Sequence, residues 1–403
     1  MAFGSPALYI FAALLLIASS TLGQSKGNGT DTDLAALLAF KAQLSDPGKI
    51  LAGNWTAGMP FCHLVGVSCS RHRQRVTALE LLGVHLEGEL SPHLGNLSFL
   101  SVLNLTITDL TGSVPDDIGS LRRLKILDLG HNALSGGIPT TIGNLTRLQL
   151  LNLEFNQFSG PILADQQGLR SLSSMNLRQN YLTGTIPENL FNNTPFLTYL
   201  NIGNNSLNDP RLHRLLANAP DSCPEVNNLT GPVPPAIFNM TNLRVISLGG
   251  NCLTGSIPGN TSFNLLALQW FSNIYNCFTG RIPLEFLACP YLQTLVLSYN
   301  QFEDVLPGNI SYAHRLSMHT PCTPTNKFGV HGVCMKYPVC IGYVAVLPSW
   351  LGMLTTLMYL AFGGNHLFGP IPAALSNLTN LTILQISLCN LTGPIPMRMA
   401  QLG

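Results

Sequence analysis

Cysteine is the residue type in this 403-residue chain whose spacing most directly suggests chemistry. Cys62 and Cys69 stand close together, and no matching second pair lies nearby to complete a zinc site, so we expect them to form a disulfide. Cys252 and Cys277 each follow an asparagine at equivalent places in the sequence. Neighbouring strands about 4.8 Å apart would bring such positions within disulfide range. We predict a second bond there, with two exposed thiols as the alternative.

A cluster of possible metal ligands lies between residues 311 and 344. It contains Cys322, Cys334 and Cys340, together with His314, His319 and His331. The cysteine spacing, C-x11-C-x5-C, matches no recognised zinc pattern, and secretion favours disulfides. We expect no bound metal and no other cofactor. The segment is either an irregular insertion or a degraded repeat.

Catalytic motifs are missing from the sequence. It contains no G-x-x-x-x-G-K-[ST] phosphate loop, no G-x-S-x-G nucleophile turn, and no H-R-D or D-F-G kinase signature. Acidic residues such as Glu80, Asp128 and Glu154 are predicted to lie on an open, solvated face, where they lack the burial that tunes the pKa values of an acid/base pair. We therefore expect that the chain is not an enzyme.

The first residues predict the compartment. The apolar run from Ala7 to Ala18 is too short to span a bilayer, so residues 1–23 are predicted to be a signal peptide, with a buried first helix as the alternative. No later stretch is apolar enough for a membrane segment, and a net charge of +1 gives no electrostatic footprint for nucleic acid. Fourteen N-x-[ST] sequons agree with secretion. The glycosylation sites we predict are Asn54, Asn96, Asn104, Asn144, Asn192, Asn204, Asn228, Asn239, Asn260, Asn377, Asn380 and Asn390.

Most of the chain repeats with a period near 24 residues. Glycine marks the phase at Gly88, Gly112, Gly136, Gly160, Gly184, Gly231, Gly255, Gly280, Gly369 and Gly393. Around Gly136 the unit reads L-x-x-L-x-x-L-x-L-x-x-N-x-L-x-G-x-I-P, which is a leucine-rich repeat. Leu127 and Leu129 alternate across a short predicted strand and point into the coil, while Asp128 points outward. Because one repeat cannot bury its leucines alone, stacked repeats are expected to share a continuous core.

An asparagine follows each predicted strand. Its amide is expected to satisfy buried backbone groups of the turn, and stacked asparagines would form a ladder. The ladder positions are Asn132, Asn156, Asn180, Asn205, Asn227, Asn251, Asn276, Asn300 and Asn365. Gly136 permits a positive φ, and Pro139 fixes φ where no amide donor is needed. These residues are scaffold.

The domain boundaries follow from the repeat. Residues 24–75 are predicted to form an N-terminal cap, whose helix begins at Asp31 or Thr32 and ends near Leu44. The Cys62–Cys69 bond would cover the open end of the first coil. Residues 76–310 carry repeats that are irregular at 209–231, residues 311–344 are the insertion or degraded repeat, and residues 345–403 carry repeats with a truncated end. The expected fold class is an α/β repeat, a right-handed solenoid with a parallel concave β-sheet and a helical cap.

The cap helix around residues 33–41, the C-x-x-x-G-V-x-C pattern at Cys62 and the repeats resemble the ectodomains of plant leucine-rich-repeat receptor-like kinases. Residues 231–239 and 258–265 are similar to the grass immune-receptor group of that family. The likeness covers residues 31–310 and 345–403, although Leu64 stands where the family cap usually has tryptophan. It implies a ligand-binding ectodomain that a membrane helix and a Ser/Thr kinase domain would follow; both are absent from this sequence.

The outward positions of the predicted sheet lie six, four, two and one residues before each ladder asparagine. Exposed aromatic side chains there would be binding anchors, and packing against neighbouring strands is the alternative. The ligand-binding residues that we predict are Asp128, Glu154, Arg178, Tyr199, Trp270, Tyr275 and Tyr299. A glycan on Asn104 would shield the N-terminal third of this surface. The irregular stretch at 209–231 is expected to divide it.

These features predict an extracellular receptor-like protein that binds a peptide or protein for defence or developmental signalling, with a co-receptor kinase as a further partner. One alternative is a secreted inhibitor of microbial wall-degrading enzymes, which would resemble the plant polygalacturonase-inhibiting proteins. Another is an inert product of a truncated receptor gene. The expected location is the secretory pathway and the cell exterior, or the plasma membrane if the gene product continues beyond residue 403.

Overall fold

The computed structural model describes residues 29–56, 59–162, 168–205, 229–259, 263–302, 345–365 and 367–396. The predicted signal peptide at 1–23 and the cysteine- and histidine-containing segment at 311–344 lie outside these residues. Within the described ranges no helix has both the length and the apolar character needed to cross a membrane.

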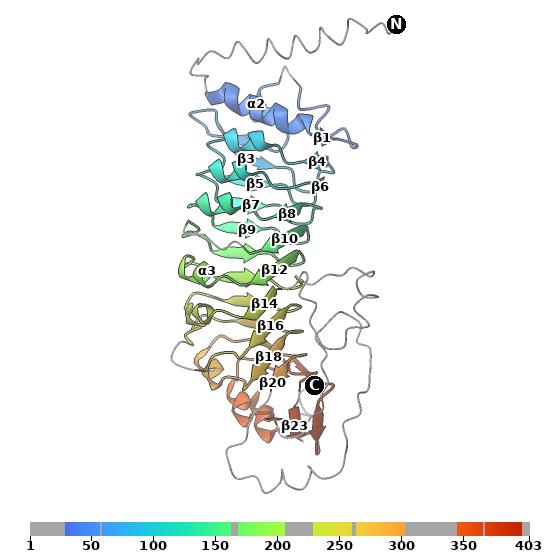
Figure 1. Ribbon diagram of the computed structural model, residues 1–403, viewed down its shortest axis with the longest axis vertical. Coiled ribbons are helices and arrows are strands. Elements are labelled where there is room, and N and C mark those ends of the chain that lie inside the picture. The colour runs from blue at the N-terminus through green and yellow to red at the C-terminus, as the bar shows by residue number, and fades with distance from the viewer. Residues whose placement is uncertain are drawn as a thin grey trace, which may run out of the picture.

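The described chain is a stack of coils, and the cap helix covers its N-terminal end (Figure 1). Most coils contribute one short strand to a twelve-stranded sheet, called the main sheet here, which is parallel apart from the antiparallel pair β2–β3. In spatial order its strands are β2 (Val67–Cys69), β3 (Val76–Glu80), β5 (Val102–Asn104), β7 (Ile126–Asp128), β9 (Leu150–Asn152), β11 (Ser174–Asn176), β13 (Tyr199–Asn201), β15 (Val245–Ser247), β17 (Trp270–Ser272), β19 (Thr294–Val296), β22 (Tyr359–Ala361) and β24 (Ile383–Gln385). The predicted leucine-rich-repeat solenoid with a parallel sheet is confirmed.

A second parallel sheet forms where each coil continues past its ladder residue. Its strands are β8 (Ser135–Gly137), β10 (Gln157–Pro161), β12 (Tyr181–Thr185), β14 (Leu229–Pro232), β16 (Cys252–Gly255), β18 (Cys277–Gly280) and β20 (Gln301–Phe302). Two three-stranded sheets extend the same row at either end of the stack. They consist of β1 (Leu44–Ser45), β4 (Glu87–Glu89) and β6 (Leu110–Thr111), and of β21 (Ala345–Val346), β23 (Leu367–Pro370) and β25 (Asn390–Thr392).

The registers of the two sheets differ, and this difference makes the predicted second disulfide wrong. In the main sheet equivalent repeat positions lie opposite each other, as Trp270 does to Val245. In the second sheet the strands are staggered, so Cys277 lies opposite Thr254 and Cys252 lies opposite Thr230. Equivalent cysteines on adjacent rungs are therefore not direct neighbours, and Cys252 and Cys277 are both buried without a bond joining them.

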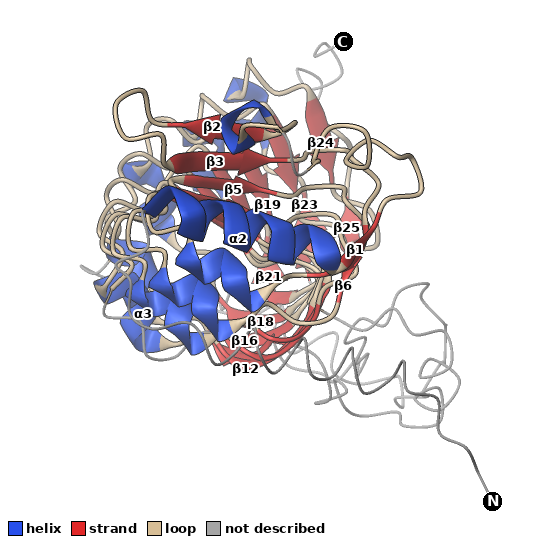
Figure 2. Ribbon diagram, turned by 90° about the horizontal axis from the view of Figure 1, so that it is seen from above, coloured by secondary structure: helices blue, strands red, loops and turns tan. Residues whose placement is uncertain are grey.

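Short helices form the third side of the stack, on the flank between the two rows of strands (Figure 2). They are η2 (Pro92–Asn96), η3 (Asp116–Ser120), η4 (Thr140–Asn144), α3 (Glu188–Asn192), η5 (Pro235–Asn239), η6 (Leu284–Ala288), η7 (Ser349–Met353) and η8 (Ala373–Asn377). A proline stands directly before most of them, as Pro139, with φ of −59°, stands before η4. Proline suits this position because its fixed φ is compatible with helix entry and a first-turn amide has no helical acceptor.

The leucines of all coils form one hydrophobic core that runs from the cap to Leu378. Leu127 and Leu129 are fully buried, as the alternation of β7 predicts. The asparagine ladder is also confirmed at the described positions. Asn227 lies outside the described residues, and Asn251 Nδ2 donates to the carbonyl of Ile202, on the coil of Asn205, at 3.1 Å. Asn156 Nδ2 donates to the carbonyls of Leu129, Leu153 and Glu154 at 2.9, 3.2 and 3.1 Å, and Asn156 Oδ1 accepts from Leu134 N at 3.0 Å.

Two further features of the ladder follow from its geometry. Gly136 has φ of +77°, the left-handed conformation that was predicted for the phase glycines. In the coil after Asn365 the ladder position is filled by Cys389, whose thiol approaches the carbonyl oxygen of Phe362 at 3.6 Å. A thiol is a weak donor, so this position reproduces only part of the asparagine's bonding.

The cap is held to the first coil by a buried ion pair that the sequence did not disclose. Helix α2 (Gly29–Ala42) begins before Asp31 and ends before Leu44, and Asp33, which lies inside it as predicted, is fully buried. The carboxylate of Asp33 accepts hydrogen bonds from Arg75 Nε, Arg75 Nη2 and Val76 N, each at 2.8 Å. The predicted disulfide between Cys62 and Cys69 is confirmed, with Cα atoms 5.6 Å apart.

The two irregular stretches do not interrupt the main sheet. Strand β13 pairs directly with β15, placing Tyr199 opposite Val245, and β19 pairs directly with β22, placing Thr294 opposite Tyr359. The described main-sheet strands on either side of each stretch are therefore direct neighbours. That residues 311–344 are either an insertion or a degraded repeat stays a prediction. Apart from the last three positions of 209–231, both predicted irregular segments lie outside the described residues.

Candidate ligand-binding surface

The candidate site is the outward face of the main sheet. Ile126 and Asp128 are half-buried on either side of the fully buried Leu127, and the same alternation holds in β9 and β11. The outward positions predicted from the repeat are therefore correct for these strands. Because the strands pair in full-repeat register, residues at one repeat position form a row that runs along the stack.

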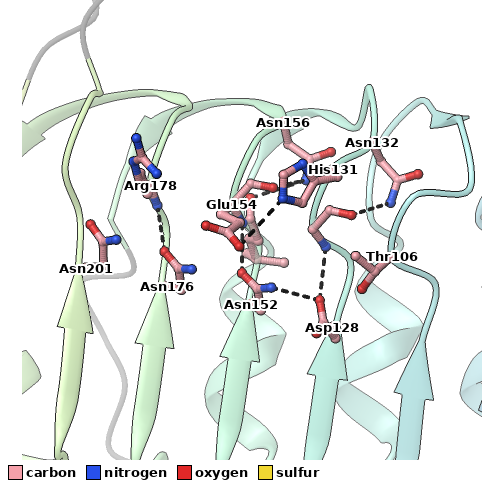
Figure 3. A network of polar contacts seen from close by, with 12 residues as sticks. Thr106, Asp128, His131, Asn132, Asn152, Glu154, Asn156, Asn176, Arg178 and Asn201 are labelled. Carbon is pink, nitrogen blue, oxygen red and sulfur yellow. Dashed lines mark hydrogen bonds and ion pairs between the residues drawn. The ribbon is translucent and has the colours of Figure 1, made fainter. Parts of the chain in front are cut away.

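One such row stands four residues before the ladder and closes the turns (Figure 3). Asp128 Oδ1 accepts from Gly130 N at 3.2 Å, and Asn152 Oδ1 accepts from Glu154 N at 3.2 Å. Asn152 Nδ2 also donates to Asp128 Oδ1 at 2.9 Å, which links two rungs. Asp128, predicted to bind ligand, therefore already uses one carboxylate oxygen within the scaffold.

The residues just before the ladder adopt an unusual backbone conformation. His131, Phe155, Tyr275 and Tyr299 have φ values of +55°, +52°, +57° and +55°. A non-glycine residue in this region carries strain of about 1–3 kcal/mol. Because the conformation recurs from coil to coil, it belongs to the turn itself, and it brings side chains of neighbouring rungs close enough to stack.

The first cluster consists of His131, Phe155, Glu154 and Arg178. The rings of His131 and Phe155 stack at 4.4 Å between centroids, and the guanidinium carbon of Arg178 lies 5.2 Å from the Phe155 centroid. His131 Nε2 stands 3.7 Å from Glu154 Oε1 (Figure 3). Glu154 and Arg178 were predicted to be site residues, and the structure brings them together around Phe155. This cluster can offer both charges and an aromatic surface to a ligand.

The second cluster consists of the stacked pair Tyr275 and Tyr299; Trp270, which we group with them, lies five residues before Tyr275 at the start of β17. Tyr275 and Tyr299 stack at 4.3 Å between centroids, and the Trp270 side chain is 43% exposed. The ring of Tyr299 lies over Gly364 on the next rung, where an added Cβ would come within 2.5 Å of it. Burial raises the pKa of Tyr275, and the neighbouring Tyr299 raises it further, so Tyr275 keeps its hydroxyl proton to higher pH than an isolated tyrosine.

Small residues separate the two clusters. Gly203 stands two residues before the ladder residue Asn205. Gly249 and Gly250 stand two and one residues before the next ladder residue, Asn251. An added Cβ on Gly249 would meet Ile274 Cγ2 at 2.6 Å, so this close approach of neighbouring rungs requires glycine. Tyr199, also predicted to be a site residue, is half-buried beside this gap, and its hydroxyl accepts from Asn201 Nδ2 at 3.3 Å.

The surface is continuous across the stretch that was expected to divide it. The expectation is corrected by the direct pairing of β13 with β15, since parallel strands joined by backbone hydrogen bonds leave no gap between them. From the first cluster's strand β9 to the second cluster's strand β17 there are four strand-to-strand steps. At roughly 4.8 Å per step, the clusters lie about 19 Å apart along the stack.

His131 and Phe155 stand at predicted outward positions, one residue before Asn132 and Asn156, but they were not among the predicted site residues. Their role became visible only in the rung-to-rung stacking. A usable signal existed, because both clusters have aromatic or imidazole side chains directly before the ladder on two consecutive rungs: His131 and Phe155, then Tyr275 and Tyr299. Among the described residues no group of histidine, cysteine, aspartate and glutamate is arranged to hold a metal ion.

Several predicted glycosylation sites can be placed relative to this surface. Asn104 is half-buried on β5, opposite Asp128, so a glycan there would lie at the N-terminal end of the surface. The side chains of Asn96, Asn144, Asn192, Asn239 and Asn377 are exposed at or near the ends of the short helices. Asn228 and Asn260 lie outside the described residues, as does the side chain of Asn390. Glycosylation at all these sites stays a prediction.

Family comparisons match the repeats and the cap. Residues 30–70 match "Leucine rich repeat N-terminal domain" and residues 98–158 match "Leucine rich repeat". Three further "Leucine Rich Repeat" units match at residues 171–193, 242–264 and 291–313. Over 98 residues the chain is 44% identical to the LRR receptor-like serine/threonine-protein kinase EFR of Arabidopsis thaliana, a match that covers 24% of this chain and 9% of that protein.

Solved structures extend the likeness to nearly the whole chain. The PEPR1–AtPEP1 structure is similar with a TM-score of 0.68 and 27% identity, covering 92% of this chain and 47% of that one. The plant peptide hormone receptor RGFR1, solved in complex with RGF2, is similar with a TM-score of 0.54 and 33% identity, covering 80% of this chain and 49% of that one. The chain thus spans about half the length of these two structures, and the match to EFR covers 9% of that protein.

Proposed function

Since the chain has the leucine-rich-repeat architecture of plant receptor-like ectodomains, we propose that it is an extracellular ligand-recognition module that binds a peptide or protein on the main sheet. The observation that carries the proposal is the pair of clusters on one uninterrupted sheet, the first charged and aromatic, the second aromatic. Aromatic and arginine side chains dominate the binding energy of most protein interfaces.

The separation of the clusters indicates the size and form of the ligand. An extended chain spans at most about 3.3–3.6 Å per residue, so bridging about 19 Å takes roughly six residues. Gly203, Gly249 and Gly250 between the clusters have no side chain to cover the backbone, and Asn204 is an exposed amide side chain in the same row. Both kinds of group offer hydrogen bonds to an extended peptide lying along the stack. RGFR1, a structural relative, is itself a peptide hormone receptor solved with RGF2, which supports this class of ligand.

The role in signalling is proposed on the same basis. EFR is a receptor-like kinase, so we infer that the module acts in a receptor complex, with a kinase supplied by a co-receptor or by further chain. Defence and development are both open to such a receptor, and the narrower likeness to the grass immune-receptor group stays a prediction. The secretory pathway and the cell exterior are the proposed location.

The test is a binding measurement on the secreted full chain. An array of extended peptides of six or more residues would be screened first, and the dissociation constant of the best binder would be measured by calorimetry. We expect Trp270→Ala and Tyr299→Ala each to weaken binding tenfold or more, as interface anchors commonly do. Tyr291→Ala is the matched control, because Tyr291 is 60% exposed but lies outside the main sheet. Unchanged affinity in both cluster variants, with circular dichroism unaltered, would place the site elsewhere.

A further inference from the structure

A second surface of the stack gathers positive charge. It is the edge where each coil enters its main-sheet strand, formed in the first five coils by residues 73–77, 97–101, 121–125, 145–149 and 169–173. These stretches contain seven arginines and lysines and no aspartate or glutamate, in a chain whose net charge is only +1. We name five exposed members the basic edge: Arg73, Arg122, Arg123, Lys125 and Arg147.

An aromatic ring organises the centre of the basic edge. The guanidinium carbons of Arg123, Arg75 and Arg73 lie 3.9, 4.6 and 5.6 Å from the ring centroid of Phe99. Arg75 is neutralised by Asp33, which it contacts at 2.8 Å. Within the described part of the chain, neither Arg73 nor Arg123 lies within ion-pair distance of a carboxylate. The Phe99 ring therefore holds the guanidinium groups of Arg73 and Arg123 close together without a neutralising carboxylate, and their positive charge can attract an anionic ligand.

The charges extend along the stack in a line. Arg123 reaches back to Phe99 on the preceding coil, while Arg122 Nη1 donates to Asn144 O, on the following coil, at 2.8 Å. Arg147 occupies the position of Arg123 one coil later. Arg123 and Arg147 thus stand at the same repeat position on neighbouring coils, about 4.8 Å apart, and Arg73 lies on the preceding side of Phe99. Such a row of charges suits an anion that repeats along a chain rather than a single small ion.

The surroundings of the basic edge select a thin, hydrophilic occupant. Asn96 and Asn144 are exposed sequon residues on the coils before and after Arg122, so glycans there would stand on both sides of it and obstruct a broad protein face. None of the five stretches 73–77, 97–101, 121–125, 145–149 and 169–173 contains an exposed large apolar side chain; the exposed Leu82 and Ile107 lie beyond them, after strands β3 and β5. A protein interface is normally built on such side chains.

We propose that the basic edge binds an acidic polysaccharide, with the guanidinium groups around Phe99 contacting its carboxylates. Guanidinium groups pair with carboxylates through two parallel hydrogen bonds, and the chain of an acidic sugar polymer is narrow, polar and regularly charged. This inference is independent of the proposed function, because the basic edge lies outside the outward face of the main sheet.

The experiment measures binding of a polygalacturonate oligomer to the secreted full chain at several salt concentrations. Its methyl-esterified form, which has the same backbone without charge, and poly-L-glutamate are the comparison probes. We expect the esterified form and poly-L-glutamate to bind at least tenfold more weakly than the acidic oligomer. Binding of the acidic oligomer should weaken as salt rises, because exposed charges are screened.

Variants then assign the site. We expect the double variant Arg73→Gln, Arg123→Gln to lose affinity tenfold or more, and Phe99→Leu, which keeps every charge, to lose several-fold. Arg281→Gln, which removes one exposed charge on another side of the stack, should bind as the unaltered chain does. Unchanged affinity in the double variant would overturn the proposal, as would equally tight binding of poly-L-glutamate. Trp270→Ala should leave oligomer binding intact, so failure of the peptide site and failure of this site are distinguishable.

Discussion

Replacing Asn156 with alanine would test how much one rung of the asparagine ladder stabilises the solenoid. The side chain is only 7% exposed and makes four hydrogen bonds to the backbone. The backbone partners of Asn156 differ in whether they keep another hydrogen bond when the side chain is removed. The carbonyl of Leu129 also accepts from Asn132 Nδ2 at 3.0 Å, and the carbonyl of Leu153 also accepts from Asn180 Nδ2 at 2.9 Å. Both acceptors therefore keep a partner in the variant.

The amide of Leu134 is the group that loses its partner. Its hydrogen bond goes to Asn156 Oδ1 at 3.0 Å, in a buried position that water does not reach. Leaving a buried donor unsatisfied costs about 1–3 kcal/mol, and the net loss of the shared carbonyl bonds adds about 1 kcal/mol. We therefore expect Asn156→Ala to lower the free energy of unfolding by about 2–4 kcal/mol.

The assay should report both global and local stability, because long repeat arrays can depart from two-state unfolding. Urea denaturation gives the change in midpoint, and hydrogen exchange gives the protection of the Leu134 amide. Asn152→Ala is the matched control on the adjacent strand, since its half-buried side chain bonds only to surface groups. We expect less than about 1 kcal/mol for the control. The loss of unfolding free energy in Asn156→Cys should lie between the losses in Asn156→Ala and Asn152→Ala, because Cys389 shows that a thiol can occupy the ladder position. Equal effects of Asn156→Ala and Asn152→Ala, with Leu134 protection unchanged, would refute the reasoning.

Three further outcomes are expected. Asp33→Ala should destabilise the cap by about 3–5 kcal/mol because it strands the guanidinium of Arg75; a coupling near zero in a double-mutant cycle with Arg75→Ala would contradict this. Burial raises the pKa of Cys289 to about 12 from an ordinary value of 9.0, so the folded chain retains a proton that the unfolded chain releases. This contribution to stability is intact below pH 9 and is lost as pH rises from 9 toward 12; native Cys289 should resist thiol reagents at pH 8.5 and react in urea. Peptide mapping of the non-reduced protein should recover Cys62 and Cys69 as one linked pair; free thiols at both would contradict the structure.

The repeat and its scaffold were predictable because each depends on one residue type at one spacing. The buried strand leucines, the bonding of Asn156 and the positive φ of Gly136 all follow from local requirements that recur in every coil. The ion pair of Asp33 with Arg75 was not predictable, because the two residues lie far apart in sequence and only the docking of α2 brings them together.

The candidate site was only partly predictable. Outward positions follow from strand alternation, so Glu154, Arg178, Trp270, Tyr275 and Tyr299 could be selected from the pattern. Their grouping depends on the left-handed turn and on register. The stagger of the second sheet separates Cys252 from Cys277. It depends on how successive coils pack against each other, so it cannot be predicted from the sequence of a single repeat.

The direct pairing of β13 with β15 and of β19 with β22 has a consequence for how such a chain can change over generations. The strands on either side of residues 206–228 and 303–344 keep full-repeat register in the main sheet. Lengthening a connection between two fixed ends adds only about 0.6 kcal/mol of closure entropy for each doubling. We therefore expect inserted sequence to be tolerated within residues 206–228 and 303–344. A peptide tag or a small folded domain whose termini lie close together could be exchanged there while every rung keeps its neighbours.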